Sequence, residues 1–180
     1  MLYLHKLNRN FLIDIRNPHW LAAYTKPKNE KKVYQRLLEA GIETYLPLQK
    51  KMRQWSDRKK LIEEPLLRSY IFIKITEKEY YKVLGIPGLV RYVTFEGKAA
   101  PIPDKQIDTL KLLLGQQVDI EVIDQVIEPG ERVEICIGSM TGFEGYLVKH
   151  SGKRKVIIQL DHISHSLLVT ISKDYIIKKQ

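Results

Sequence analysis

Residues 50–60 read KKMRQWSDRKK and combine six Lys or Arg side chains with one Asp and one Trp. Clustered cations bind the phosphate groups of nucleic acids, and an aromatic ring among them can stack on a base. A charged run by itself is more often a solvated surface, and a residue such as Trp55 is often half buried against a sheet. The residue types alone leave two interpretations open: a nucleic-acid-binding surface, or a charged hairpin tip.

Aromatic and apolar side chains gather in two further segments, one before and one after this basic segment. They are Trp20, Tyr24 and Pro27 in the first, and Leu66, Leu67, Tyr70 and Phe72 in the second. Such residues usually build a core, which we favour for Trp20 and Phe72. Tyrosines whose polar ends stay free are typical of partner-binding surfaces. The group is therefore a second candidate for an interaction surface.

The residues that could serve catalysis or metal binding lack the partners that such chemistry needs. The glycines of IGSMTGFEG have predicted strands on both sides, whereas a phosphate-cradling loop needs a helix N-terminus. His162 and His165 supply two ligands where a zinc site needs three or four. No nucleophile lies in a recognisable catalytic motif. The sequence predicts a binding protein that is not an enzyme and has no metal site and no cofactor.

The elements that must position these residues begin with a strand at 19–25 and a helix that ends at Gly41. Strands follow at 42–48 and 66–75, then a short helix at 77–84, a strand at 88–97 and a helix at 103–115. The order β-α-β-β-α-β-α predicts an α+β domain of the split βαβ type, an antiparallel sheet with flanking helices. Its first and third strands should be central neighbours, and the basic segment should lie at or near a hairpin tip.

The remainder of the chain has a different pattern. We interpret residues 116–123 as a linker, followed by short strands at 132–137, 144–150, 155–160 and 165–171 separated by Gly and Ser turns. Short strands in so few residues predict a small closed β-barrel. The expected organisation is an N-terminal extension of unknown role at 1–18, a first domain at 19–115, the linker, and a barrel domain at 124–180.

The net charge of +9 is unevenly distributed along the chain. Residues 1–114 contain 22 Lys and Arg against 12 Asp and Glu, whereas residues 115–180 contain 8 against 9. This asymmetry indicates two modules with different partners, the first facing a polyanion. No apolar run approaches the roughly 20 residues that span a bilayer, and residues 1–18 lack the pattern of a secretory signal. With Cys136 as the single cysteine, we expect a cytoplasmic protein with no membrane partner.

Several motifs together resemble a known family. WLAAYTKPKNEK, YLPL, EEPLLRSYIFI and VRYVTFEGKAAPIP resemble the N-terminal (NGN) domain of NusG-type transcription factors. IEPGERVEI and GSMTGFEG resemble their C-terminal KOW domain, a small SH3-like barrel. The resemblance covers about residues 19–178 and is strongest to specialised paralogues of the UpxY and RfaH kind.

The resemblance implies a transcription elongation and antitermination factor, specific for an operon such as one for surface polysaccharide biosynthesis. Its N-terminal domain would bind the β′ clamp helices of RNA polymerase, with the β subunit as a further contact. The implied polymerase-binding residues are Tyr24, Leu67, Tyr70 and Phe72. Those implied to face upstream or non-template DNA are Lys26, Arg53, Trp55, Arg58, Lys59 and Lys60.

Two departures from the family pattern bear on these implied sites. Leu67-Arg68-Ser69 stands where many relatives have an aromatic-Pro-Gly triplet, and Ser139-Met140 replaces the usual Pro-Phe of the KOW loop. The resemblance nevertheless implies that Met140 and Phe143 face a KOW-domain partner, either ribosomal protein S10 or termination factor Rho. An alternative from another class is an RNA-binding or ribosome-associated KOW module.

Overall fold

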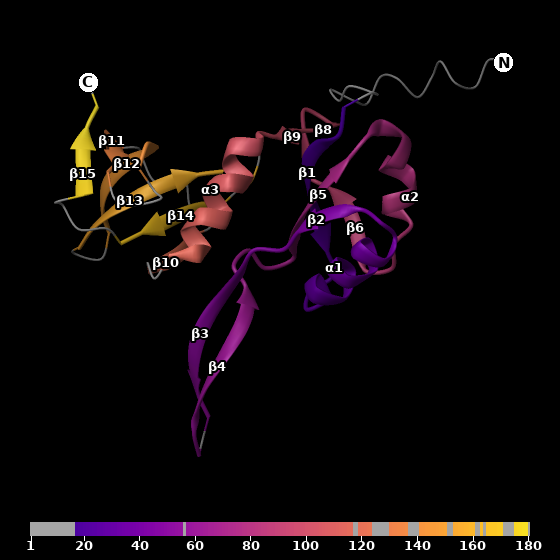
Figure 1. Cartoon of the computed structure of the whole chain (residues 1–180), viewed down its shortest axis with the longest axis horizontal. Coiled ribbons are helices and arrows are strands. Elements are labelled where there is room, and N and C mark those ends of the chain that lie inside the picture. The colour runs from indigo at the N-terminus through magenta and orange to yellow at the C-terminus, as the bar shows by residue number, and fades with distance from the viewer. Residues whose placement is uncertain are drawn as a thin grey trace. The chain divides into compact units, whose positions relative to one another are not determined.

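The computed structural model describes residues 17–55, 57–116, 119–123, 130–136, 141–150, 153–160, 163, 165–170 and 175–179. Almost all of the predicted N-terminal extension lies outside this range. The chain divides into two compact units, one up to Asp104 and one from Lys105. Both units contain antiparallel sheets, and helices are few: α1 and α2 belong to the first unit and α3 to the second (Figure 1).

The first unit is built on a sheet with strand order β2-β5-β1-β6, in which β9 also pairs with β1. The strands are β1 His19–Thr25, β2 Glu43–Tyr45, β5 Tyr70–Ile75, β6 Leu89–Tyr92 and β9 Pro101–Ile102. Strands β1 and β5 are antiparallel from His19 opposite Ile75 to Tyr24 opposite Tyr70. The predicted central pairing of the first and third strands is confirmed.

The helices α1 (Glu30–Glu39) and α2 (Tyr80–Leu84, preceded by the 3₁₀ turn η2, Glu77–Glu79) pack on one face of this sheet. Val33 and Leu37 of α1 join Leu21, Ile71 and Ile73 of the sheet in one buried cluster. Helix α1 ends because Gly41 adopts a φ of +75°, a conformation that favours glycine. The amide of Ile42 then donates to the carbonyl of Leu37 at 2.9 Å, which closes the last turn.

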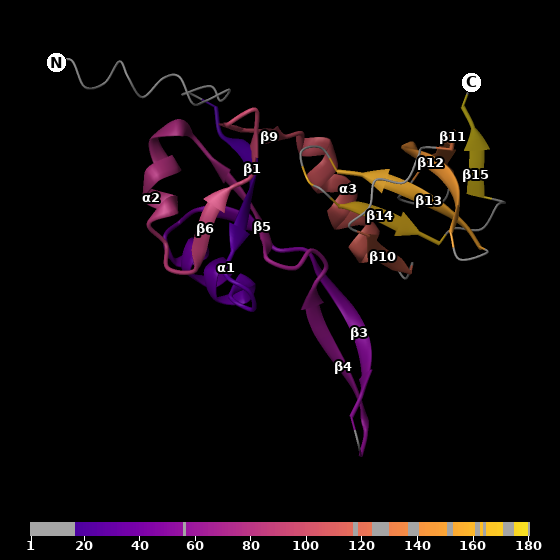
Figure 2. The same cartoon turned by 180° about the vertical axis from the view of Figure 1, so that it is seen from behind.

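Strands β3 (Leu48–Gln54) and β4 (Lys59–Pro65) form a separate two-stranded hairpin that extends from the first unit (Figures 1 and 2). The basic segment is therefore mostly strand and not only a tip. The predicted strands at 42–48 and 66–75 are correspondingly shorter, because 66–69 is a loop. The predicted strand at 88–97 is divided into β6 and β7 (Thr94–Phe95), and β7 pairs with β8 (Lys98–Ala99) through a turn at Glu96 and Gly97.

The second unit contains α3 (Asp104–Gly115), apart from its first residue, and a six-stranded sheet in the order β10-β14-β13-β12-β11-β15. The strands are β10 Ile120–Ile123, β11 Glu131–Ile135, β12 Phe143–His150, β13 Lys153–Gln159, β14 Ser166–Val169 and β15 Ile176–Lys178. All neighbouring strands are antiparallel. Closure of this sheet into a barrel stays a prediction.

Two features of the second unit correct the sequence interpretation. Residues 120–123 were assigned to the linker, but they form β10, whose Ile120 is buried opposite Val169 of β14. A short segment that alternates with acidic residues can complete a sheet edge while its charges face solvent. The division between the units falls at the junction of β9 and α3, not after the predicted residue 115.

Gly145 provides a test of packing in the second unit. A Cβ atom at this position would lie 2.5 Å from Cγ1 of Val156 and 2.6 Å from the carbonyl oxygen of Ile157. We expect Gly145→Ala to destabilise the second unit by about 1–3 kcal/mol because the neighbouring strand must move. Urea unfolding with amide hydrogen exchange of β12 measures this change.

Gly115→Ala is the matched control, because nothing lies within 4 Å of the added Cβ. It should change the stability little. Equal effects of the two substitutions would show that the close approach at Gly145 does not limit packing.

Candidate interaction surfaces

The sheet face opposite α1 and α2 has an aromatic composition. Successive side chains of a strand point to opposite faces, so Leu21 and Ala23 face the helices while Trp20, Ala22 and Tyr24 face away. The register brings further residues to this second face, because directly opposed residues share a face. We call it the aromatic face; its members are Trp20, Tyr24, Tyr45, Tyr70, Phe72, Lys74 and Arg91.

At one end of the aromatic face, two tyrosines and an arginine are in contact. The hydroxyl groups of Tyr70 and Tyr24 are hydrogen-bonded at 3.1 Å, and their ring centroids lie 4.7 Å apart. The guanidinium of Arg91 lies 4.9 Å from the centroid of the Tyr24 ring, within the range of a cation–π interaction. This end presents hydroxyl groups, a ring and a cation together.

At the other end, Lys74 lies 5.6 Å from the centroid of the Trp20 ring and 4.0 Å from carboxylate oxygens of Glu43 and Asp104. Between the two ends, Tyr45 stacks on Phe72 with 6.3 Å between ring centroids. Burial raises the pKa of Tyr45 to about 12. Its phenol is therefore protonated and uncharged near neutral pH.

The four predicted polymerase-binding residues differ in exposure. Leu67 and Phe72 are fully buried, Tyr70 is 4% exposed, and Tyr24 is only partly buried. The structure brings Tyr24 and Tyr70 together, whereas Leu67 and Phe72 lie beneath the surface. Sequence reasoning missed Arg91 and Tyr45, although the strand alternation around each of them was a usable signal.

The loop at 66–69 leads directly into Tyr70 and is fixed by backbone hydrogen bonds. Ser69 has a φ of +61°, which costs a non-glycine residue about 1–2 kcal/mol. Its amide donates to the Glu30 carboxylate at 2.8 Å, and its carbonyl accepts from the amide of Thr25 at 2.9 Å. Glu30 is only 6% exposed. This buried acid on α1 therefore fixes the conformation from which β5 starts.

The β3–β4 hairpin holds five of the six predicted nucleic-acid-binding residues. Arg53 lies directly opposite Lys60, a like-charge pair that is unfavourable without an anion nearby. Trp55 is 53% exposed, and its amide donates to the carbonyl of Arg58 at 2.8 Å. Lys59 lies opposite Gln54. The sixth residue, Lys26, follows β1 on a different segment and is exposed.

One interaction joins the hairpin to α1, and another joins its two strands. The ammonium group of Lys31 in α1 donates to the carbonyl of Glu63 at 2.9 Å. Arg53 lies 3.6 Å from the Glu64 carboxylate. The remaining basic side chains near the tip are largely solvated, since the ion pair of Arg58 with Asp57 at 3.9 Å is exposed on both sides and such pairs contribute little.

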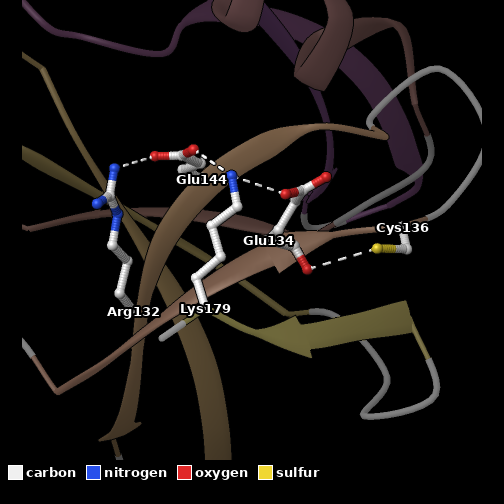
Figure 3. A network of polar contacts seen from close by, with 5 residues as sticks. All are labelled: Arg132, Glu134, Cys136, Glu144 and Lys179. Atoms are coloured by element: carbon white, nitrogen blue, oxygen red, sulfur yellow. Dashed lines mark hydrogen bonds and ion pairs between the residues drawn. The ribbon is translucent and has the colours of Figure 1, made fainter.

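Ion pairs connect β11, β12 and the end of the chain in the second unit (Figure 3). Lys179 lies 2.6 Å from Glu144 and 2.9 Å from Glu134, and Arg132 also donates to Glu144. Hydrogen bonds from Lys179 and then Arg132 lower the pKa of Glu144 to about 2. The Glu144 carboxylate thus stays ionised, and it links β12 to Arg132 of β11 and to Lys179.

The predicted KOW partner-binding residues are only partly described. Phe143 begins β12 opposite Ile135 and is half-buried. Met140 lies outside the described residues. Within the described ranges, no group of three or more His, Cys, Asp or Glu could hold a metal ion. No helix in that part of the chain is long and apolar enough to span a bilayer.

Comparisons with known proteins agree on one family. Residues 18–111, more than half of the chain, match the family described as "Transcription termination factor nusG". The "Transcription termination/antitermination protein NusG" of Streptococcus pyogenes serotype M3 is 26% identical, over 83% of this chain and 90% of its own length. The protein of the same name from Lactococcus lactis is 23% identical, over 75% of this chain and 80% of its own.

A solved structure described as "Domain interaction in Thermotoga maritima NusG" superposes with a TM-score of 0.56. It is 18% identical in sequence, and the match covers 93% of this chain and 100% of that chain. At this identity the likeness shows a shared fold.

Glu30 generates a prediction about the loop that precedes Tyr70. Glu30→Ala removes the acceptor of the Ser69 amide, and an unsatisfied buried donor costs about 1–3 kcal/mol. We expect the Ser69 amide to exchange its hydrogen faster in this variant, as measured by NMR. Glu39→Ala, at the exposed end of the same helix, is the control and should leave Ser69 unchanged. Unaltered protection of Ser69 in Glu30→Ala would contradict the role of this hydrogen bond.

Proposed function

Because this chain belongs to the NusG family of transcription termination/antitermination proteins, which are not enzymes, we propose that it binds the β′ clamp helices of RNA polymerase through its aromatic face. The observation that supports this proposal is the contact among Tyr24, Tyr70 and Arg91. Tyr and Arg are enriched at protein interfaces, where a ring supplies apolar area and its polar groups supply direction.

The burial of Leu67 and Phe72 refines the roles within this surface. Tyr24 and Arg91 would touch the clamp, while Tyr70, Phe72 and Leu67 support them from beneath. Bound in this way across the channel of the polymerase, the protein would favour processive transcription and oppose pausing or termination.

The hairpin would face upstream DNA or the non-template strand through Arg53, Trp55, Arg58 and Lys60, with Lys26 as an additional cation. Lys59, the remaining residue that the resemblance implies, lies opposite Gln54 on the other side of the hairpin. The exposed Trp55 beside the solvent-exposed cations Arg53, Arg58 and Lys60 supports this assignment. The sequence resemblance supports operon-specific antitermination, and a cytoplasmic location follows from that function. The second unit would contact ribosomal protein S10 or Rho near Phe143.

Tyr24 offers the sharpest test of clamp binding. Tyr70→Ala would be ambiguous, because truncating a buried aromatic side chain costs about 3–5 kcal/mol of stability. Tyr24 is partly exposed, so Tyr24→Ala should fold and lose about tenfold or more in affinity for polymerase. A pull-down from nuclease-treated lysate, probed for the β′ subunit, measures this loss.

Tyr81→Ala is the matched control, since Tyr81 is a 56% exposed tyrosine on α2. It should bind polymerase as the wild type does. Capture of β′ by Tyr24→Ala at the wild-type level would argue against the aromatic face. Capture of ribosomal proteins that disappears after nuclease treatment would favour the ribosome-associated alternative.

The hairpin charges predict a salt dependence. Replacing Arg53, Arg58 and Lys60 with Gln should weaken binding to elongation complexes and flatten the log-log plot of affinity against salt. Each lost phosphate contact should reduce its slope by about 0.9 on duplex DNA. Fluorescence anisotropy over a salt series measures the slope.

The control removes the same charge elsewhere, at the exposed Lys28, Lys32 and Lys82. If both triple variants change the slope equally, net charge and not the hairpin accounts for DNA affinity.

A further inference from the structure

The β3–β4 hairpin has two chemically different faces. Directly opposed residues share a face, and successive pairs alternate. Arg53 and Lys60 therefore lie on one side, and Trp55 follows at the next position of the same alternation. Met52 and Leu61 oppose each other on the other side. We call these the basic face and the apolar face of the hairpin.

The apolar face leaves large side chains in solvent. Met52 is 62% exposed and Leu61 is 55% exposed, the former among the highest values for a large hydrophobic residue in the described chain. Opposed apolar side chains stabilise a hairpin by about 0.2–1 kcal/mol. This contribution would explain the presence of the pair if the two side chains covered most of each other's surface. A pair that leaves more than half of each side chain in water has apolar area available for a partner.

Two lysines flank this apolar pair on its own face, together with one glutamate and one glutamine. Lys50 precedes it on the same side, opposite Glu63, and Lys59 follows it, opposite Gln54. The four positions that flank Met52 and Leu61 are therefore polar, and both lysines are exposed. The complementary surface is thus apolar at its centre and carries carboxylates opposite the two lysines.

We propose that the apolar face of the hairpin docks on a protein surface of the transcription complex, a small apolar patch with carboxylates placed opposite Lys50 and Lys59. Phosphate groups provide no apolar contact for Met52 and Leu61, and the ring suited to base stacking, Trp55, belongs to the basic face. This inference rests on the proposed function, because it places nucleic acid against the basic face. The hairpin then lies between nucleic acid on one side and protein on the other.

The experiment compares the full-length wild type with Met52→Thr/Leu61→Thr, which replaces both apolar side chains with a β-branched residue that favours strands. The probe is purified core RNA polymerase free of nucleic acid, with binding followed by biolayer interferometry. We expect the double variant to lose about tenfold in affinity, the effect typical of two truncated contacts at an interface. Its affinity for a short DNA duplex, and the salt dependence of that affinity, should stay at the wild-type values.

A second variant tests the rim. Lys50→Gln/Lys59→Gln should slow association with core polymerase at low salt and have little effect at high salt, because rim charges act mainly on the association rate. Leu38→Gln removes a 43% exposed leucine from α1 and serves as the control that should bind normally. Thermal unfolding by circular dichroism establishes that all variants are folded.

Three outcomes would overturn the inference. Wild-type affinity of Met52→Thr/Leu61→Thr for core polymerase would show that the pair has no role in docking. A parallel loss of DNA affinity would assign the apolar face to nucleic acid, and conversion of a wild-type dimer into a monomer in sedimentation would assign it to a second copy. If the wild type itself fails to bind polymerase, the proposed function fails too. If only Tyr24→Ala loses binding, the proposed function stands without this inference.

Discussion

The antiparallel pairing of β1 with β5 determines the first unit. Its register places Tyr24 opposite Tyr70 and Ala22 opposite Phe72, so one set of side chains meets the helices and the other forms the aromatic face. A shift by one residue would exchange the two sets, because the side chains of a strand alternate with a period of two. The helix-facing set, including Leu21, Ile71 and Ile73, is fully buried. Burial of this set therefore holds the aromatic face in position.

Glu30 connects this pairing to the segment that enters it. The carboxylate is on α1, its hydrogen bond is to the Ser69 amide, and Ser69 precedes the first residue of β5. The same helix contacts the hairpin through Lys31, which donates a hydrogen bond to the carbonyl of Glu63 in β4. One helix thus relates the aromatic face to the hairpin within a single unit, which would fix the distance between a polymerase contact and a nucleic-acid contact.

Sequence patterns predicted the elements whose apolar spacing is regular. The strand at 19–25, the part 70–75 of the strand predicted at 66–75, and the helix with Val33 and Leu37 are of this kind, because burial on one face leaves a clear period. The hairpin strands were missed because both of their faces are solvated, and charged residues on both sides give no alternation to detect. Strand β10 was missed because four residues among acidic neighbours resemble a linker.

The site was predictable in part. Residue types placed Tyr24 and Tyr70 in one aromatic and apolar group, and the structure brings these two side chains into contact. Residue types also marked the basic segment as exposed, and its described side chains are exposed on the hairpin. The burial of Leu67 and Phe72 depends on which side chains pack around them, which one sequence does not specify. Strand alternation indicates the face on which Arg91 lies, but its contact with Tyr24 depends on how β6 pairs with β1, and the register between strands far apart in the sequence has no local signature.

The separate sheet of the β3–β4 hairpin has a consequence for how such a protein diversifies. Because its outer side chains take no part in the buried cluster of the first unit, substitutions there leave folding nearly unaffected. Selection can therefore change what the hairpin recognises without a compensating change in the scaffold. Gene duplicates that share the same sheet and helices could in this way acquire different targets by exchanging only this ribbon.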